Sequence, residues 1–325
     1  MGRYSRGRSP APLALVAALL VGVGGSLGVL RAADETESAV RRVEGLDEFL
    51  TKEAGPSENF LLVGSDSREG SLEAADETSR RSDTIMILRR EKGGGAALLS
   101  IPRDLWVAIP GQGEGKINAA YNGGPELLAR TVTESLGIPI KHYVEIDFNG
   151  FKKMVDTIGG VEICVLYATK DVGSGLNLQP GCHQLNGETA LQYARSRKYE
   201  EFIDGEWRLD PRADLGRIER QQNFIRIAVD RALGQMENDP FASGRLIDAV
   251  VASVRIDEAI EPVDAAKSLR AAAQDGLQTV QLPVEGGVIG DQAVVTMVDG
   301  AEQILDYFRG KGELPASATT TTTTN

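Results

Sequence analysis

The chain has 325 residues, of which 42% are apolar and 25% charged, the composition of an ordinary globular protein. Its net charge of −12 argues against general nucleic-acid binding, because no overall positive field attracts a phosphate backbone. Only two cysteines and two histidines are present, which argues against a zinc site built from these side chains. Local arginine clusters on so acidic a protein favour a discrete anionic ligand over a polymer groove.

The N-terminus predicts a membrane anchor. Residues 11–30 carry no charge, and this run has about the length that a helix needs to cross a bilayer. The arginines that precede this run place the N-terminus in the cytoplasm and the rest of the chain outside. The alternative is a cleaved signal peptide, although the residues after Arg31 are a poor cleavage context. We expect a cytoplasmic tail (1–10), a transmembrane helix (11–30), an extracytoplasmic tether (31–56) with some helix over Val40–Lys52, one folded domain (57–310) and a disordered tail (311–325).

Strand and helix patterns alternate along the folded domain. The predicted strands are Phe60–Val63, Thr84–Leu88, Ala96–Ile101, Leu105–Ile109, His142–Ile146, Val161–Val165 and Thr279–Leu282. The predicted helices are Gly123–Leu136, Phe148–Ile158, a helix capped by Asn186 that includes Tyr193, Arg212–Gln235, Ile247–Val254, Val263–Ala273 and Val294–Phe308. This alternation predicts a single α/β domain with a central mixed β-sheet flanked by helices.

Cys164 and Cys182 both lie in the part of the chain expected outside the cell. An even number of cysteines in that environment favours a disulfide, which would add about 3 kcal/mol by the chain-entropy model. The alternative is two separate small residues of the core.

Asp66 follows the strand Phe60–Val63, and Asp83 opens the strand Thr84–Leu88. If these strands are antiparallel neighbours, the two carboxylates meet at one end of the sheet. Two carboxylates together with phosphate oxygens are a usual way to hold Mg²⁺. The alternative is that each aspartate stabilises a turn at a strand end.

Four arginines flank the same predicted strands and one helix. Arg81 and Arg103 come before and after strands at the end of the sheet that Asp66 and Asp83 would share. Arg195 and Arg197 come late in a helix and, being two residues apart, do not share a helical face. Each could bind phosphate through its planar fork, or could simply extend into solvent.

Arg217 and Gln221 are four residues apart on the longest predicted helix and therefore share a face. That face lies opposite the apolar stripe that includes Leu215, Ile218 and Ile225. It could line a phosphate site or could be an ordinary solvated helix surface.

Taken together, these motifs resemble the LytR-CpsA-Psr (LCP) family. The blocks that carry the resemblance are NFLLVGSDSR, RRSDTIMIL, LLSIPRDLWVAIPG, KINAAYNGG, HYVEIDFNGFKKMVDTIGGV, LNGETALQYARSR and DLGRIERQQNF, in this order. The resemblance is close from about Ser57 to Arg231 and continues to about Phe308. The long acidic stretch 69–80 between the two aspartate blocks departs from the family pattern, and we expect it to be a surface loop.

The resemblance implies a membrane-anchored, extracytoplasmic phosphotransferase of the cell envelope, dependent on Mg²⁺. Such an enzyme moves an anionic glycopolymer, for example a teichoic acid or capsule polymer, from a polyprenyl-pyrophosphate carrier to peptidoglycan. By motif position, Asp66 and Asp83 are expected metal ligands, and Arg81, Arg103 and Asp66 are expected catalytic residues. The pyrophosphate is expected to contact Arg81, Arg103, Arg195, Arg197, Arg217 and Gln221.

Two other functions fit the same residues. One is a pyrophosphatase that releases the polyprenyl-linked glycan to water. The other is a non-catalytic envelope protein that binds glycolipid or regulates partners. In all three cases the expected partners are a lipid-linked glycan and the membrane, without nucleic acid.

Overall fold

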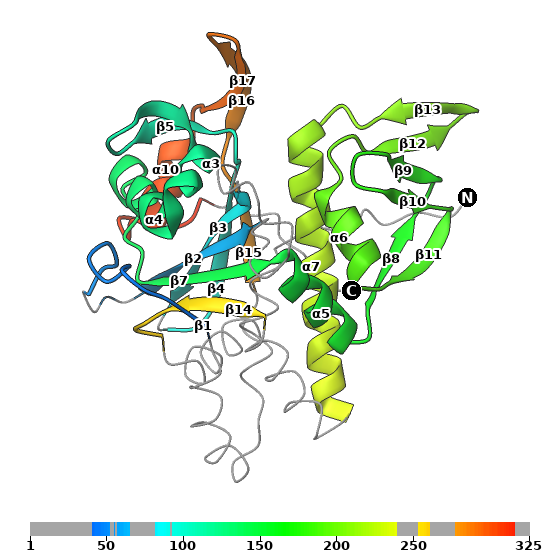
Figure 1. Cartoon of the computed structure of the whole chain (residues 1–325), viewed down its shortest axis with the longest axis horizontal. Helices are drawn as coiled ribbons and strands as arrows, with labels where there is room; N and C mark the ends of the chain where they lie inside the picture. The colour runs from blue at the N-terminus through cyan, green and yellow to red at the C-terminus, as the bar shows by residue number, and fades with distance from the viewer. Residues whose placement is uncertain are drawn as a thin grey trace, which may run out of the picture.

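A seven-stranded mixed sheet lies at the centre of the computed structural model (Figure 1). The structure describes residues 41–52, 55, 57–65, 82–91, 93–238, 253–260 and 277–315. In spatial order the strands are β1 (Arg41–Val43), β14 (Val254–Asp257), β7 (His142–Asp147), β2 (Ser57–Ser65), β3 (Ser82–Glu91), β4 (Ala96–Ile101) and β15 (Leu277–Gln281). β2 is parallel to β7 and antiparallel to β3, which is antiparallel to β4. The last residues of β2, β7 and β4 and the first residues of β3 therefore lie at the same end of the sheet.

Helices cover both faces of this sheet, as Figure 1 shows. One face packs against α3 (Ile117–Ala120), α4 (Gly124–Ser135) and α10 (Ala301–Phe308), and the other against α5 (Phe148–Thr157), α6 (Gly187–Arg195) and α7 (Ala213–Asn238). The single turn η1 (Tyr121–Gly123) joins α3 to α4. The domain is therefore a three-layer α/β/α arrangement.

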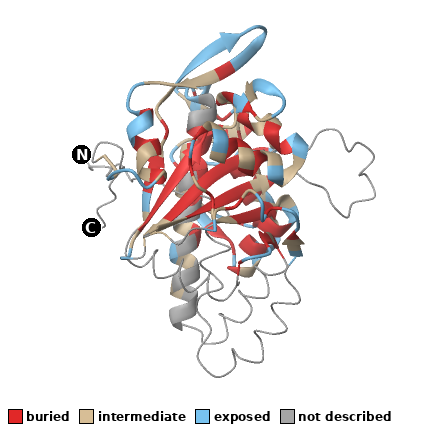
Figure 2. Cartoon of the chain, turned by 90° about the vertical axis from the view of Figure 1, so that its left-hand side faces the viewer, coloured by how far each residue is buried: buried red, intermediate tan, exposed pale blue. Residues whose placement is uncertain are grey.

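The central strands are buried on both sides because their sequences are almost continuously apolar. In β2, Phe60 and Leu62 face the layer of α5, α6 and α7, whereas Leu61 and Val63 face the layer of α4 and α10. Each such side chain stabilises the fold by about 1.5–3 kcal/mol when it is withdrawn from water. Figure 2 shows this buried sheet as a red band inside the molecule. A slip of one residue would exchange the two sets of side chains, so the packing also defines the register.

Capping side chains define where two of the covering helices begin. Asp147, the last residue of β7, accepts a hydrogen bond from the backbone amide of Gly150 at 2.7 Å and so caps α5. Asn186 accepts one from the amide of Thr189 at 3.0 Å and caps α6, as its sequence position predicted. Each cap is worth about 1 kcal/mol of helix stability.

Smaller sheets surround the central one. Between α5 and α7 the chain forms β8 (Val161–Val165), β9 (Thr169–Asp171), β10 (Leu176–Leu178), β11 (Gly181–Leu185), β12 (Glu200–Ile203) and β13 (Glu206–Leu209). Strands β9, β10, β12 and β13 form one sheet, and β8 pairs with β11. The hairpins β5 (Trp106–Ile109) with β6 (Gly113–Lys116) and β16 (Val284–Ile289) with β17 (Gln292–Met297) lie near α3 and α10 (Figure 1).

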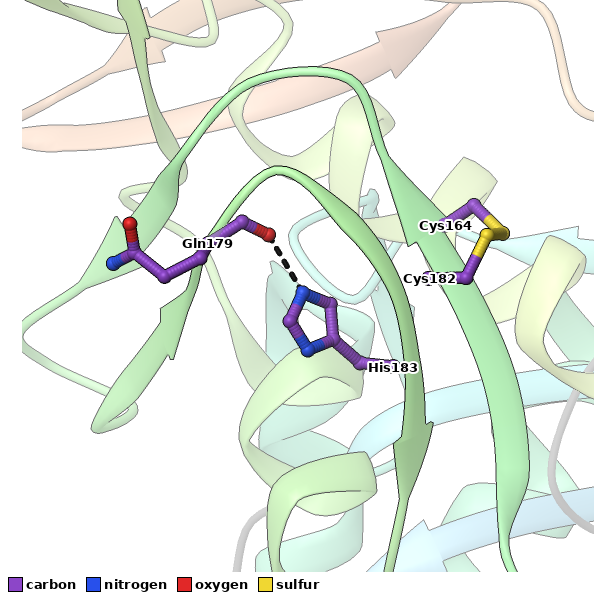
Figure 3. Close-up of a disulfide and its surroundings, with 4 residues drawn as sticks. All are labelled: Cys164, Gln179, Cys182 and His183. Carbon is purple, nitrogen blue, oxygen red and sulfur yellow. Dashed lines mark hydrogen bonds between the residues drawn. A yellow bond between two sulfur atoms is a disulfide. The ribbon is translucent and has the colours of Figure 1, made fainter.

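The predicted disulfide is present. Cys164 of β8 and Cys182 of β11 are direct partners in the antiparallel register and are joined by a disulfide (Figure 3). Beside the bridge, the His183 ring lies 2.6 Å from the Gln179 carbonyl oxygen. The bridge closes a loop formed by residues 165–181, which contains β9 and β10 and lies before α6.

The predicted fold class is confirmed, because one α/β domain is built on a central mixed sheet. Most predicted strands match within a few residues, and β4 and β8 match at both ends. Of the strands in the smaller sheets, only β5 and β8 were predicted, and three-residue segments such as β9 and β10 carry too little periodicity to be recognised.

Two helix predictions are wrong in part. Val294–Met297 belongs to strand β17, and the helix begins only at Ala301. The segment is rich in β-branched residues, which favour strands, and Gly300 interrupts the chain with a φ of +91°. Val254, expected at the end of a helix, instead begins β14. The helix expected over residues 263–273 lies outside the described residues.

Residues 41–52 also differ from the expectation of a partly helical tether. Arg41–Val43 is a strand of the central sheet, parallel to β14. Val43, Leu46 and Leu50 are buried in the core beside α4 and α10. This segment is therefore packed against the domain.

In the part of the chain that the structure describes, no helix is long and apolar enough to cross a bilayer. The transmembrane helix predicted for residues 11–30, the cytoplasmic tail and the C-terminal residues 316–325 lie outside that part.

Candidate functional site

A pocket lies where β2 and β7 end and α5 begins. The space between its walls is about 400 Å³ when the open solvent at its mouth is counted with it. The residues that line it are Gly64, Thr84, Ile146, Asp147, Phe148, Phe151, Leu191, Ala194, Arg195, Arg217 and Gln221. Because this set combines two arginines with aliphatic and aromatic walls, we call it the arginine pocket. It lies on the face of the sheet that α5, α6 and α7 cover.

The sheet side of the arginine pocket depends on a glycine. A Cβ atom at Gly64 would lie 3.1 Å from Cβ of Thr84, closer than ordinary packing allows. Gly64 therefore permits β2 and β3 to approach each other and leaves the space above them open. Its backbone pairs with Thr84, and both residues line the pocket.

Arg217 and Gln221 occupy one face of α7, as their spacing predicted, but that face is not solvated. Arg217 is 2% exposed and Gln221 is 3% exposed. The Gln221 side-chain amide donates hydrogen bonds to the Ala194 carbonyl oxygen at 3.0 Å and to the Thr84 hydroxyl at 3.3 Å. This residue therefore joins α7 to α6 and β3 at the pocket wall, and the interpretation of an ordinary surface stripe is wrong.

Arg195 and Arg197 lie on either side of the end of α6. Arg195 is the last residue of the helix, is exposed, and places its guanidinium carbon 4.4 Å from the centre of the Phe148 ring. Arg197 lies beyond the C-cap residue Ser196, outside the helix in which the sequence suggested it. Both arginines therefore belong to the helix end and the loop after it, where a charged group can reach a ligand.

Arg103 lies at the same end of the sheet but does not line the arginine pocket. The pairing of Ile85 with Ile101 brings the residues after β4 beside the start of β3. Since β3 separates β4 from β2, the end of β4 that precedes Arg103 is about 10 Å from the end of β2 in the plane of the sheet. Its side chain is 15% exposed, and its Nε lies 3.6 Å from a carboxylate oxygen of Asp104.

Asp83 lies at an irregularity in the pairing of β2 with β3. Gly64 pairs with Thr84 and the next residue, Ser65, pairs with Ser82, so Asp83 has no direct partner on β2. Such bulges redirect side chains and are frequent beside active sites. Nothing further is described of the Asp83 side chain, and Asp66 and Arg81 lie outside the described residues.

The strand pairing agrees with the predicted pair of metal ligands, because it brings position 83 close to the last residue of β2. Antiparallel β2 and β3 bring position 83 beside the end of β2, directly before Asp66 in the sequence. Two carboxylates attached there would offer hard oxygen ligands of the kind that Mg²⁺ prefers. Among the residues that the structure describes, no cluster of three or more histidine, cysteine, aspartate or glutamate side chains could hold a metal.

A buried carboxylate holds the end of β2 from the opposite face of the sheet. Glu145 of β7 is 1% exposed and accepts hydrogen bonds from the Ser65 hydroxyl at 2.8 Å and the Tyr121 hydroxyl at 2.7 Å. The Tyr143 hydroxyl donates to its other oxygen at 3.0 Å, and Arg255 lies 3.8 Å away. Burial, and then the charge of Glu145, raise the pKa of both tyrosines, so both remain hydrogen-bond donors. Ser65, the last residue of β2, is thereby anchored.

Several residues of this region were not predicted from the sequence. Asp147 could have been found, because an aspartate followed by an amphipathic run is a typical helix N-cap. Thr84 and Phe148 join the pocket only through tertiary packing, and no local pattern distinguishes them from core residues. The buried side chains of Asp171 and Arg220 contact the backbone of the loop after α6, and a sequence gives no sign of such contacts.

Comparison with known proteins identifies a family and several relatives of this chain. The model of the LytR_cpsA_psr family matches residues 27–309. "Probable cell wall biosynthesis protein LcpB" of Corynebacterium glutamicum is 36% identical over 264 residues, which cover 77% of this chain and 61% of that protein. The "polyisoprenyl-teichoic acid–peptidoglycan teichoic acid transferase TagU" of Oceanobacillus iheyensis is 31% identical over 239 residues, covering 71% of this chain and 68% of that protein.

The fold agrees as well. The solved structure of a "LytR-Csp2A-Psr enzyme from Actinomyces oris" superposes with a TM-score of 0.67 and 26% identity, over 83% of this chain and 95% of that one. The resemblance carried by the seven sequence blocks is confirmed by the family model across almost the whole described domain. The chain belongs to the LytR-CpsA-Psr family.

Proposed function

We propose that this protein is a membrane-anchored, extracytoplasmic phosphotransferase that moves an anionic glycopolymer from a polyprenyl-pyrophosphate carrier to peptidoglycan. The observation that carries the proposal is the composition of the arginine pocket. Arg195 of α6 and Arg217 of α7 offer cationic donors, Gln221 holds α7 against α6 and β3, and Ile146 and Phe151 offer apolar walls. A diphosphate attached to a lipid requires this combination, because one part of it binds to guanidinium groups and the other part avoids water.

The protein's own residues would act mainly by positioning and by neutralising charge, which is the usual way in phosphoryl transfer. Arg195, Arg197 and Arg217 would bind the diphosphate oxygens, and Arg103 and Arg81 would contact the same group from the strand side. An acceptor hydroxyl oxygen forms a bond to the phosphorus that carries the glycopolymer. The bond from that phosphorus to the bridging oxygen breaks, and polyprenyl phosphate leaves. The hydroxyl proton passes to a carboxylate at this end of the sheet, for which Asp66 is the candidate.

Mg²⁺ would be held by Asp66 and Asp83, and when bound it would neutralise charge on the diphosphate. The position of Asp83 at the β2–β3 irregularity, beside the end of β2, supports this assignment. The anchoring of Ser65 by Glu145 also supports it, because the residue before Asp66 is then held in place.

Two observations support a location outside the cytoplasm. Disulfides persist in oxidising compartments, and Cys164 and Cys182 form one. The uncharged run 11–30, preceded by arginines, is suited to a single membrane span with the domain outside.

The proposal can be tested with the full-length protein in detergent, a lipid-linked glycopolymer donor, Mg²⁺, and peptidoglycan oligomers as acceptor. We expect product only when the acceptor is present, and Arg103→Ala and Arg195→Ala to slow its formation at least tenfold. Arg130→Ala is the matched control, because Arg130 is a partly exposed arginine of α4 that pairs with Glu134 at 3.0 Å and lies over the Phe49 ring. Release of polyprenyl phosphate at the same rate without acceptor would instead identify a pyrophosphatase. Donor binding without any product would identify a binding or regulatory protein.

A further inference from the structure

Arg195 ends α6 and Arg197 lies in the loop that follows, and buried groups hold this loop on several sides. Its C-cap residue, Ser196, is extended, with φ −60° and ψ 121°, and is fully buried. The side chain of Arg195 is exposed at the pocket. If the backbone of this loop moves, the two arginine side chains beside it are no longer held in position to bind a ligand. The contacts that hold the loop therefore matter for the site.

The carboxylate of Asp171 contacts three consecutive residues of this loop. One of its oxygens accepts hydrogen bonds from the Ser196 hydroxyl at 2.8 Å, the Arg197 amide at 2.8 Å and the Lys198 amide at 2.9 Å. Its other oxygen accepts from the Gly173 amide at 2.8 Å. Asp171 is 2% exposed and ends β9, 24 residues before Arg195 in the sequence.

The ionised form of Asp171 suits this role. Burial opposes ionisation, but the hydrogen bonds from Ser196, Lys198, Gly173 and Arg197 outweigh it and lower the pKa of the carboxyl. Hydrogen bonds to a charged acceptor are about twice as strong as bonds between neutral groups. The loop is therefore fastened to a buried negative charge that does not itself line the arginine pocket.

A second contact reaches the same loop from α7. Arg220 donates to the Ser196 carbonyl oxygen at 2.8 Å, forms an ion pair with Asp210 at 3.0 Å, and lies 4.2 Å above the centre of the Tyr199 ring. Arg220 is one position before Gln221, which holds Ala194 on the other side of the loop. The loop backbone is thus fixed between β9 and the pocket-lining helix α7.

We propose that Asp171 is a positioning residue for the diphosphate site, which acts by holding the backbone of residues 196–198 so that Arg195 and Arg197 both reach the ligand. This inference rests on the proposed function. Asp171 makes no contact with substrate and acts only through the two arginines.

The first test measures the loop itself and does not depend on activity. Asp171→Asn keeps the size of the side chain but replaces one acceptor oxygen by an amide donor, which faces amides that are donors already. Hydrogen exchange of the full-length protein, followed by mass spectrometry, should become at least tenfold faster in the segment 196–199 and unchanged in α4. Unchanged exchange in that segment would overturn the inference whatever the enzyme does.

The second test measures transfer per folded molecule from the lipid-linked donor to peptidoglycan oligomers. Asp171→Asn should lower turnover about 10- to 100-fold, the range expected when catalytic groups are misplaced by an ångström or less. In an Arg197→Ala background the same substitution should have less than half of its effect on a logarithmic scale, because part of what Asp171 positions is then absent. Equal effects in the two backgrounds would contradict action through the arginine.

The matched control is Asp257→Asn. Asp257 is also fully buried, and its carboxylate accepts hydrogen bonds from the Tyr143 amide at 2.8 Å and the Ala259 amide at 2.9 Å, away from the pocket. We expect it to lower the melting temperature without changing turnover of the folded protein by more than twofold. A turnover loss as large as that of Asp171→Asn would mean that any buried carboxylate has the same effect, and would overturn the inference.

If Asp171→Asn fails to fold, Ser196→Ala replaces it, because it removes one of the three loop hydrogen bonds. It should lower turnover severalfold and speed exchange in the segment 196–199. No change in either measurement would overturn the inference. If wild-type protein transfers nothing while loop exchange responds as expected, the proposed function fails and the structural role of Asp171 stands.

Discussion

Reduction of the disulfide between Cys164 and Cys182 should destabilise the domain by a predictable amount. The two cysteines are 18 residues apart in the sequence. For a closed loop of this size, the entropy removed from the unfolded chain corresponds to about 3 kcal/mol. A domain of this size loses about 2–4 °C of melting temperature per kcal/mol, so we expect a decrease of about 6–12 °C.

The geometry explains why this loss should appear as stability of the folded state and not as a change of fold. Cys164 and Cys182 are paired residues of β8 and β11, and their strands remain hydrogen-bonded to each other without the bridge. The bridge closes the segment that contains β9 and so Asp171, which contacts the loop after α6. Reduction should therefore also speed hydrogen exchange in β9.

The measurement is thermal unfolding followed by circular dichroism, with and without a thiol reductant. The control is the double variant Cys164→Ser with Cys182→Ser, which should melt at the temperature of reduced wild-type protein and should not respond to the reductant. A decrease below about 2 °C in reduced wild-type protein would refute the entropy argument. An equal response of the double variant would show that the reductant acts elsewhere.

Three further predictions concern the site and the acid stability of the domain. Arg217→Lys keeps the charge but removes the planar fork; if Arg217 binds the diphosphate, donor affinity should fall about 10- to 100-fold, equivalent to about 1.5–3 kcal/mol for a charge-assisted hydrogen bond. Arg231→Lys, on the same helix but bonded to the Ile158 carbonyl oxygen at 2.9 Å, should leave that affinity within twofold of wild type, and a titration of binding decides between the two outcomes. Removal of divalent ions with a chelator should abolish transfer and Mg²⁺ should restore it, whereas full activity in the chelator would exclude a metal from the reaction. Burial opposes the ionisation of Glu58, but the hydrogen bonds and charges of Lys141 and Arg90 prevail and lower its pKa from 4.5 to about 2. Because the folded pKa is the lower one, this stabilisation is present above pH 4.5 and is lost as pH falls toward 2. Urea unfolding at pH 6 and pH 3 should show a smaller loss of stability in Glu58→Gln than in wild type, and equal losses would contradict the assignment.

Much of the core fold could be predicted from the chain itself. The run from Phe60 to Val63 is apolar without interruption, and such runs are typical of central strands that helices cover on both faces. Asn186 and the spacing of Arg217 and Gln221 are local features, so a cap and a shared helix face followed directly from them. The cysteine pair was predictable because only one pairing is possible.

Strand β17 was not predictable in the same way. Val294 and its neighbours are apolar in a pattern that suits either a short helix or a strand, and pairing with β16 decides between them. The same holds for β1, whose three residues become a strand only because β14 lies beside them. Hydrogen bonds between segments distant in the sequence leave no local periodicity.

For this protein, the sequence by itself determined the fold class, the disulfide and the residue types of the proposed phosphate site, because each depends on composition, spacing or a motif within one segment. The tertiary structure decided which of those residues meet. It placed Arg195, Arg217 and Gln221 around one pocket and Arg103 two strands away at the same end of the sheet. It also decided that the helix face of Arg217 is buried, because α6 and β3 pack against that face of α7. Contacts of this kind arise only when distant segments pack together, and a single sequence holds no record of them.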